Sequence, residues 1–293
     1  MKGRTIAVTG ASGGVGSRVV RELVARVRSP VLALARRPDA VPLPGHAQSR
    51  LADYDVPETL REAFGGVQTL VFVSSDGVAA KMRRHHEHVV AAAVDAGVEH
   101  VVYTSILDDA PHSRFYYAGV HHATERLLAD SGLRRCFART SVFADFFVTT
   151  WLEPAFASGV LSLPAGAGRM SLQTRDDAAA ALAVAAASAR EGIITLTGPE
   201  ALGVADVCRL AEAAAGRRLR YRAVVEATYR AQLAAERAPS WLIEAYTSMF
   251  ASVVEGRFAA VSADLPQLID RPPQTFAQFA AGALRPVTER LGA

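Results

Sequence analysis

The chain has 293 residues, of which 50% are hydrophobic and 21% charged, and its formal net charge is +3. That length and apolar content suffice for one large α/β domain, alone or with a small lobe. The positive balance is mild and no dense stripe of Lys and Arg accompanies it, so charge gives no indication of nucleic-acid binding.

Strand and helix patterns alternate through the first half of the chain. Apolar, β-like runs occupy 5–9, 31–35, 69–73, 99–104 and 135–140, and a weaker strand precedes Asp53. Helix-like runs occupy 14–27, 57–64, 80–96 and 116–130. Several strands are continuously apolar, which is typical of strands buried on both faces. The alternation predicts an α/β fold with a doubly wound parallel sheet of the Rossmann type.

The second half combines short apolar pieces with Pro/Gly turns. An Ala-rich helix begins at Asp176-Asp177, a strand is expected at 193–197, and helices near 203–215, 225–236 and 239–254. We predict a Rossmann domain over residues 1–150 and a smaller C-terminal α/β lobe over residues 151–293, with the chain returning to the sheet at least once. Ligands of such sheets bind outside the carboxyl ends of the strands.

Cysteine content and apolar runs indicate the cellular compartment of the protein. Cys136 and Cys208 have neither a CxxC nor a metal-binding spacing, so both are expected to be buried structural thiols. The longest apolar stretch, 178–189, is too short to span a bilayer. No signal-peptide pattern precedes the first strand. We therefore expect a soluble, cytoplasmic protein that does not associate with membranes.

A glycine-rich turn follows the first strand and leads into the first helix. Glycines let the backbone turn tightly and approach a pyrophosphate, and the helix N-terminus offers it free N–H groups. This position in the first strand–helix unit favours a dinucleotide site over an ordinary βα loop. The residues expected to contact the cofactor there are Gly10, Ser12, Gly13, Gly14, Val15 and Gly16.

The residue after the second strand indicates which dinucleotide binds. An NAD site usually has an acidic residue here, whereas this chain has Arg36 and Arg37. A guanidinium binds a 2′-phosphate bidentately, so we expect NADPH rather than NADH and assign the phosphate to Arg36. The alternative is a pair of solvated loop arginines. Asp53 is a candidate to bind the adenine amino group, or it makes only a turn and an N-cap.

Polar residues end two further strands. Ser74 and Ser75 follow the fourth strand, and Thr104 and Ser105 end the fifth. Residues at these positions are expected to line the cofactor, with Ser74 and Ser75 at the nicotinamide ribose. Turn formation is the alternative explanation for them.

The helix expected at 116–130 carries Tyr117 and His121. Short-chain dehydrogenases have Tyr-x-x-x-Lys at this spacing, which puts both side chains on one helix face. The lysine lowers the tyrosine pKa and binds the ribose, and the tyrosine donates a proton to the carbonyl oxygen. Tyr117 and His121 are therefore the candidate catalytic pair, with His121 also a cofactor ligand. Histidine is positively charged only when it is protonated, so it lowers the tyrosine pKa less dependably than lysine does. Tyr117 would therefore be a weaker acid. Alternatively, the helix simply packs its aromatic residues in the core.

The segment 81–88 is rich in histidine, but no distant Cys or Asp set completes a metal site. We expect no metal and a solvated helix start facing the crevice.

Together these residues resemble the NmrA-like branch of the atypical short-chain dehydrogenases, and within it the NAD(P)H:quinone oxidoreductases. The resemblance spans nearly the whole chain and rests on segments 8–16, 35–38, 53–55, 96–105, 121–125, 131–133, 176–178, 196–199 and 271–276. It implies NADP(H) binding by residues 1–150 and a substrate cleft roofed by the lobe. It does not specify a reaction, because the branch includes reductases of quinones and related electrophiles as well as non-catalytic sensors of the NADP/NADPH state.

Two departures from the main dehydrogenase pattern bear on the reaction. His121 replaces the lysine, and Ile106-Leu107 stand where a catalytic serine often lies. Hydride transfer to a quinone leaves a phenolate-like oxygen that needs little acid assistance, whereas a ketone leaves an alkoxide. We therefore expect an NADPH-dependent reductase of a quinone or similar conjugated carbonyl. The alternatives are a non-catalytic NADP(H) redox sensor and a biosynthetic ketoreductase that uses Tyr117 as its acid.

An aromatic run after Arg139 is the candidate wall of the acceptor site. Flat aromatic side chains stack on a flat ring, although the same residues are equally suited to the core of the lobe. The residues are Phe143, Phe146, Phe147 and Trp151. Helices flanking such sheets often form dimers, which leaves a homodimer open as the assembly.

Overall fold

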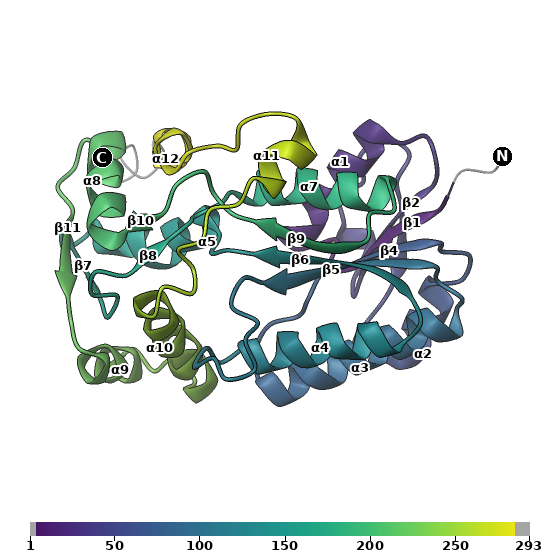
Figure 1. Cartoon of the computed structure of the whole chain (residues 1–293), viewed down its shortest axis with the longest axis horizontal. Helices are drawn as coiled ribbons and strands as arrows, with labels where there is room; N and C mark the ends of the chain where they lie inside the picture. The colour runs from purple at the N-terminus through teal and green to yellow at the C-terminus, as the bar shows by residue number, and fades with distance from the viewer. Residues whose placement is uncertain (1–3, 285–293) are drawn as a thin grey trace.

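The apolar runs of the first half form a sheet of seven parallel strands in the order β3-β2-β1-β4-β5-β6-β9 (Figure 1). The strands are β1 Ile6–Val8, β2 Val31–Ala35, β3 Gln48–Leu51, β4 Thr69–Phe72, β5 His100–Ile106, β6 Arg134–Thr140 and β9 Gly192–Leu196. The computed structural model describes residues 4–284. Residues 1–3 and 285–293, at the ends of the two expected domains, lie outside the described residues. The predicted Rossmann sheet is confirmed.

Helices cover both faces of this sheet (Figure 1). On one face lie α1 Gly16–Arg26, α7 Arg175–Ala187 and α11 Asp264–Ile269. On the other lie α2 Pro57–Ala63, α3 Ala79–Asp95 and α4 Ala118–Asp130. Every residue of β1, β2 and β4 is buried as a result, which explains why these strands are apolar throughout except at Thr69, the first residue of β4. A short 3₁₀ turn, Pro38–Ala40, follows β2.

The Ala-rich helix α7 begins with an N-cap at Thr174. The Pro-rich segment 271–274 contacts the first turn of this helix. The Thr174 hydroxyl accepts the Asp177 N–H at 3.1 Å. The Asp177 carboxylate accepts the Gln274 N–H at 2.8 Å and pairs with Arg271 at 2.6 Å. These contacts attach residues 271–274 to the start of α7.

The C-terminal lobe has its own core and two small sheets, β8 with β10 and β7 with β11. Its first part contains α5 Ala144–Phe147, a π-helical segment Val148–Leu152, α6 Glu153–Ala155, β7 Val160–Leu163 and β8 Arg169–Met170. The chain then returns to the main sheet as α7 and β9. The second part contains β10 Leu202–Gly203, α8 Val204–Ala215, β11 Arg220–Ala223, α9 Glu226–Ala235, α10 Ser240–Val254 and α12 Phe276–Ala283. Because α5 follows the end of β6 closely, the lobe stands at the carboxyl edge of the sheet (Figure 1).

The two cysteines are buried as predicted, Cys136 in the sheet core and Cys208 in the lobe core. Among residues 4–284, no helix has the length and apolar character needed to cross a membrane.

Candidate active site

The turn between β1 and α1 requires glycine at two positions. Gly10 has a φ of +60°, and a Cβ on Gly16 would lie only 2.3 Å from the Gly10 carbonyl oxygen. Within the described residues, no acceptor of the chain takes the N–H groups of Ser12, Gly14 or Val15, and α1 begins without a side-chain cap. Free N–H groups at a helix N-terminus form an anion site that fits a pyrophosphate.

Arg175, the first residue of α7, reaches the same turn and was missed by sequence analysis. The Gly13 N–H donates to the Gly10 carbonyl at 2.9 Å, and a Cβ on Gly14 would lie 3.2 Å from Cζ of Arg175. The guanidinium also lies over the Phe143 ring, 5.7 Å from its centroid. Burial lowers the pKa of Arg175. A half-buried cation thus stands beside the free N–H groups. The signal in the sequence was a basic residue at a helix start, where acidic residues are favoured.

Arg36 and Arg37 follow β2 directly and both are exposed. Neither forms an ion pair within the part of the chain that the structure describes, so both guanidinium groups are available to an anion. Asp53 lies in the next loop, where its carboxylate accepts the Asp55 N–H at 3.0 Å. Asp53 therefore makes a turn. It does not cap α2, which begins after Val56 without a side-chain cap, so the N-cap alternative was wrong. The adenine contact of Asp53 stays a prediction.

The carboxyl ends of β4 and β5 are joined by the predicted polar residues. The Ser74 N–H donates to the Thr104 hydroxyl at 2.8 Å. Ser105 is only 1% exposed, and its hydroxyl donates to Oε1 of Glu125 at 2.6 Å. Thr104 thus links the ends of β4 and β5, whereas the side chain of Ser105 belongs to a buried network.

That network is a charge cluster centred on Arg139. The Arg139 guanidinium donates to both Glu125 oxygens, at 3.1 and 2.6 Å, and pairs with Asp109 at 2.6 Å. The neighbouring carboxylates raise the pKa of Arg139, with the Glu125 hydrogen bonds contributing most. The cluster connects β6, α4 and the loop after β5.

Tyr117 and His121 make their hydrogen bonds to different parts of the fold. The Tyr117 hydroxyl donates to the Gly77 carbonyl at 3.2 Å, and burial raises the pKa of Tyr117 to about 12. His121 is 3% exposed, with Nδ1 2.8 Å from the Tyr103 hydroxyl, and burial lowers the pKa of His121 to about 3. His121 is therefore neutral at physiological pH and supplies no positive charge to Tyr117.

The expectation of a solvated start to α3 was wrong for two of its histidines. His85 and His86 are buried because they connect α3 to neighbouring segments. His86 Nε2 accepts the Ser75 N–H at 3.4 Å, and its Nδ1 lies 2.7 Å from the Thr124 hydroxyl. Within residues 4–284, no group of three or more His, Cys, Asp or Glu side chains is arranged to hold a metal ion.

The four aromatic residues proposed for the acceptor wall divide into two pairs. Phe147 is fully buried in the lobe core, and Trp151 is 6% exposed with its Nε1 donating to the Tyr229 hydroxyl at 3.0 Å. Phe143 and Phe146 are partly exposed. The Arg175 guanidinium lies over the Phe143 ring and beside Gly14, so Phe143 lies close to the glycine turn. Of the buried pair, Trp151 packs against Phe146, with ring centroids 5.1 Å apart.

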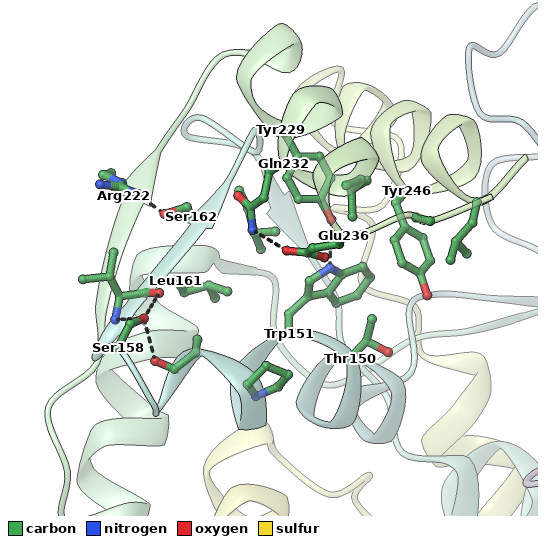
Figure 2. A pocket seen from close by; sticks show the side chains of 17 residues that line it. Thr150, Trp151, Ser158, Leu161, Ser162, Arg222, Tyr229, Gln232, Glu236 and Tyr246 are labelled. Carbon is green, nitrogen blue, oxygen red and sulfur yellow. Dashed lines mark hydrogen bonds between the residues drawn. The ribbon is translucent and has the colours of Figure 1, made fainter. Parts of the chain in front are cut away.

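A cavity of about 790 Å³ opens beside Trp151 within the lobe (Figure 2). Its lining comes from residues 150–163, β11, α9 and α10, and includes none of the predicted cofactor residues. Tyr246 borders both regions. Its ring lies 6.0 Å from that of Phe146, and burial raises the pKa of Tyr246, with the Asp76 carboxylate adding to the effect. The cavity thus includes Trp151 of the predicted acceptor wall but none of the predicted cofactor residues.

Comparisons with known proteins agree with this geometry. The sequence profile of the NmrA-like family matches residues 2–271. Quinone oxidoreductase 2 from Escherichia coli (strain K12) is 31% identical over 279 residues, which cover 93% of this chain and 96% of that protein. An NAD(P)H azoreductase from Xenophilus azovorans is 32% identical over 284 residues, covering 94% and 96%.

A solved structure gives the same result at the level of the fold. The crystal structure of the E. coli NADPH-dependent quinone oxidoreductase complexed with NADPH superposes with a TM-score of 0.86 and 29% identity, covering 94% of this chain and 98% of that one. The predicted family resemblance is confirmed.

Proposed function

Because the chain belongs to the NmrA-like family and is an NAD(P)H-dependent oxidoreductase, we propose that it reduces a quinone or similar conjugated carbonyl. The main support is the weakness of its Tyr117–His121 pair. The Tyr117 hydroxyl is bound to Gly77 and its pKa is about 12. A site of this kind suits an acceptor whose reduced anion is stable, since such an anion needs little acid assistance.

NADPH, when bound, supplies the hydride. We assign its pyrophosphate to the N–H groups of Ser12, Gly14 and Val15, with Arg175 adding positive charge beside Gly14. We assign the 2′-phosphate to Arg36, which is exposed at the end of β2. The chain's contribution to catalysis is then mainly to hold cofactor and acceptor in contact and to exclude water between them.

The acceptor ring is proposed to stack against Phe143 and Phe146. Both are partly exposed, and Phe143 lies beside Arg175 and therefore beside the glycine turn. Phe146 packs edge-on against Trp151, with ring centroids 5.1 Å apart, which fixes its orientation. A flat, apolar wall of this kind suits a planar conjugated ring.

The experiment is a panel of acceptors assayed by NADPH oxidation, with naphthoquinones, azo dyes and saturated ketones compared by kcat/KM. We expect quinones to be reduced fastest and saturated ketones not at all. Reduction of a saturated ketone that is lost in Tyr117→Phe would favour a ketoreductase instead. NADPH binding, followed by its fluorescence, without turnover of any acceptor would favour a redox sensor.

A further inference from the structure

Asp145 lies between the two arginines that flank the glycine turn. Its Oδ2 accepts the Arg175 N–H at 2.9 Å, and its Oδ1 pairs with the Arg18 guanidinium at 3.5 Å. The Asp145 side chain is 12% exposed. Asp145 belongs to α5, whereas Arg18 lies on α1 and Arg175 begins α7, two helices that lie side by side on one face of the sheet (Figure 1). One carboxylate thus connects the helix after the glycine turn to the helix that begins beside it.

Backbone hydrogen bonds just before Asp145 fix its position. The Ala144 N–H donates to the Gln173 carbonyl at 2.7 Å, and the Gln173 N–H donates to the Val142 carbonyl at 3.1 Å. These bonds hold the start of α5 alongside the segment that leads into α7. The Asp145 carboxylate therefore meets the first turn of α7, where the helix dipole favours a negative group.

The side chain of Arg175 extends from this anchored N–H to the glycine turn. A Cβ on Gly14 would lie only 3.2 Å from Cζ of Arg175. Within residues 4–284, the Arg175 guanidinium forms no ion pair or hydrogen bond with another group of the chain. Its donors are therefore available to a bound phosphate, and where they lie depends on how the backbone of Arg175 is held.

Arg18, in contrast, is held independently of Asp145. Its guanidinium donates to the Gly14 carbonyl at 2.7 Å and to the Asp176 carboxylate at 3.0 Å, both shorter than its 3.5 Å contact with Asp145. The N–H of Arg175 has no acceptor inside its own helix, because Arg175 is the first residue of α7. The contact of Asp145 that nothing else replaces is thus the one to the Arg175 N–H.

Two roles of Asp145 predict opposite effects on an anion at the turn. The Asp145 carboxylate counteracts the lowering of the Arg175 pKa by burial, so it lies within electrostatic range of the guanidinium. As a charge alone, it repels a pyrophosphate, and its removal would tighten binding. As the acceptor of the Arg175 N–H, it holds a cation where the pyrophosphate binds, and its removal would weaken binding.

We propose that Asp145 is a positioning residue for the cofactor, which holds the Arg175 guanidinium at the pyrophosphate by accepting the Arg175 N–H. This role rests on the pyrophosphate site proposed above and is independent of which acceptor is reduced. NADPH and NADH share the pyrophosphate, so Asp145 supports the binding of both to the same extent. Arg36, assigned to the 2′-phosphate, supports only NADPH.

The test measures the Kd of NADPH and of NADH by fluorescence titration at one ionic strength. The variants are Asp145→Ala, Asp145→Asn and Arg175→Ala, and urea unfolding checks that each is folded under the titration conditions. Both Asp145 variants remove the same charge, but only alanine also removes the acceptor of the Arg175 N–H, so Asp145→Asn is the matched control. The double variant Asp145→Ala/Arg175→Ala tests whether Asp145 acts through Arg175.

Arg175→Ala should weaken the binding of both cofactors by about 10-fold, the loss expected for one hydrogen bond to a charged group. Asp145→Ala should weaken both by about 5-fold, because the guanidinium remains but is no longer held in place. Asp145→Asn should leave the Kd unchanged or lower it, because the amide retains an acceptor while a negative charge is lost. In the Arg175→Ala background, Asp145→Ala should no longer weaken binding.

An unchanged or lower Kd in Asp145→Ala would overturn the positioning role, since the carboxylate would then act at most as a charge. Equal weakening by Asp145→Ala and Asp145→Asn would overturn it as well, and so would undiminished weakening by Asp145→Ala in the Arg175→Ala background. Should Asp145→Ala fail to fold, Asp145→Ser replaces it, because the serine side chain is one bond too short to reach the Arg175 N–H.

Failures of the proposed function give different results. An unchanged Kd in Arg175→Ala would overturn the pyrophosphate assignment on which the role of Asp145 rests. Wild-type protein that binds NADPH but reduces no acceptor would overturn the reductase function and leave the role of Asp145 intact.

Discussion

Replacing Arg36 by alanine should convert a preference for NADPH into near indifference between NADPH and NADH. Arg36 is exposed at the end of β2. A hydrogen bond to a charged group contributes about 1.5 to 3 kcal/mol, and exposure to water favours the lower end of that range. A loss of about 1.5 to 2 kcal/mol corresponds to a Kd for NADPH that is roughly 10- to 30-fold weaker. NADH has no 2′-phosphate, so its Kd should hardly change.

The assay is fluorescence titration of both cofactors at one fixed ionic strength. Arg37→Ala is the matched control, because it removes the same charge from the adjacent, equally exposed position. Its effect on NADPH should be small, less than about threefold, as expected for a charge without direct contact. Equal weakening of NADPH and NADH by Arg36→Ala would refute the phosphate assignment, and a larger effect from Arg37→Ala would transfer that assignment to Arg37.

Three further outcomes follow from the site. Tyr117→Phe should reduce kcat for quinones by much less than the ~100-fold typical of a lost general acid, because the hydroxyl is bound to Gly77; a loss of that size in steady-state assays would restore Tyr117 as the acid. Glu125→Gln should lower the free energy of unfolding in urea by about 3 kcal/mol, since it breaks a charge pair in which Glu125 is 8% exposed, and the exposed Glu87→Gln should change it by less than about 0.5 kcal/mol. Equal stability of these two variants would contradict the network. Burial lowers the pKa values of His86 and His121 from 6.5 to about 2 and about 3. Stability should therefore be full above pH 6.5 and fall below it, because only the unfolded chain then binds these protons, by at most about 1.4 kcal/mol per pH unit for each histidine. Urea unfolding at neutral and mildly acidic pH measures this, and a flat profile would show that the rings accept protons in the folded state.

Sequence alone was sufficient for those features whose physical cause is local. Gly10 is required by its own positive φ, and Gly16 by the Gly10 carbonyl six residues before it. Because both causes are local, the turn could be predicted from the sequence. Strands buried on both faces must be continuously apolar, which made the sheet predictable. Arg36 follows its strand at once, so its position at the sheet edge needed no further information.

The chemistry at the sheet edge was decided by tertiary structure. Arg175 reaches Gly14 from a helix that begins far along the chain, and Ser75, His85 and Asp55 meet from three separate segments. A parallel sheet gathers loops from distant parts of the chain at one edge, and no local spacing encodes which side chains then come into contact. Tertiary structure likewise decides which polar side chains are buried. The polar start of α3 was expected to be solvated, but packing against neighbouring segments buries His85 and His86, and both contact Ser75.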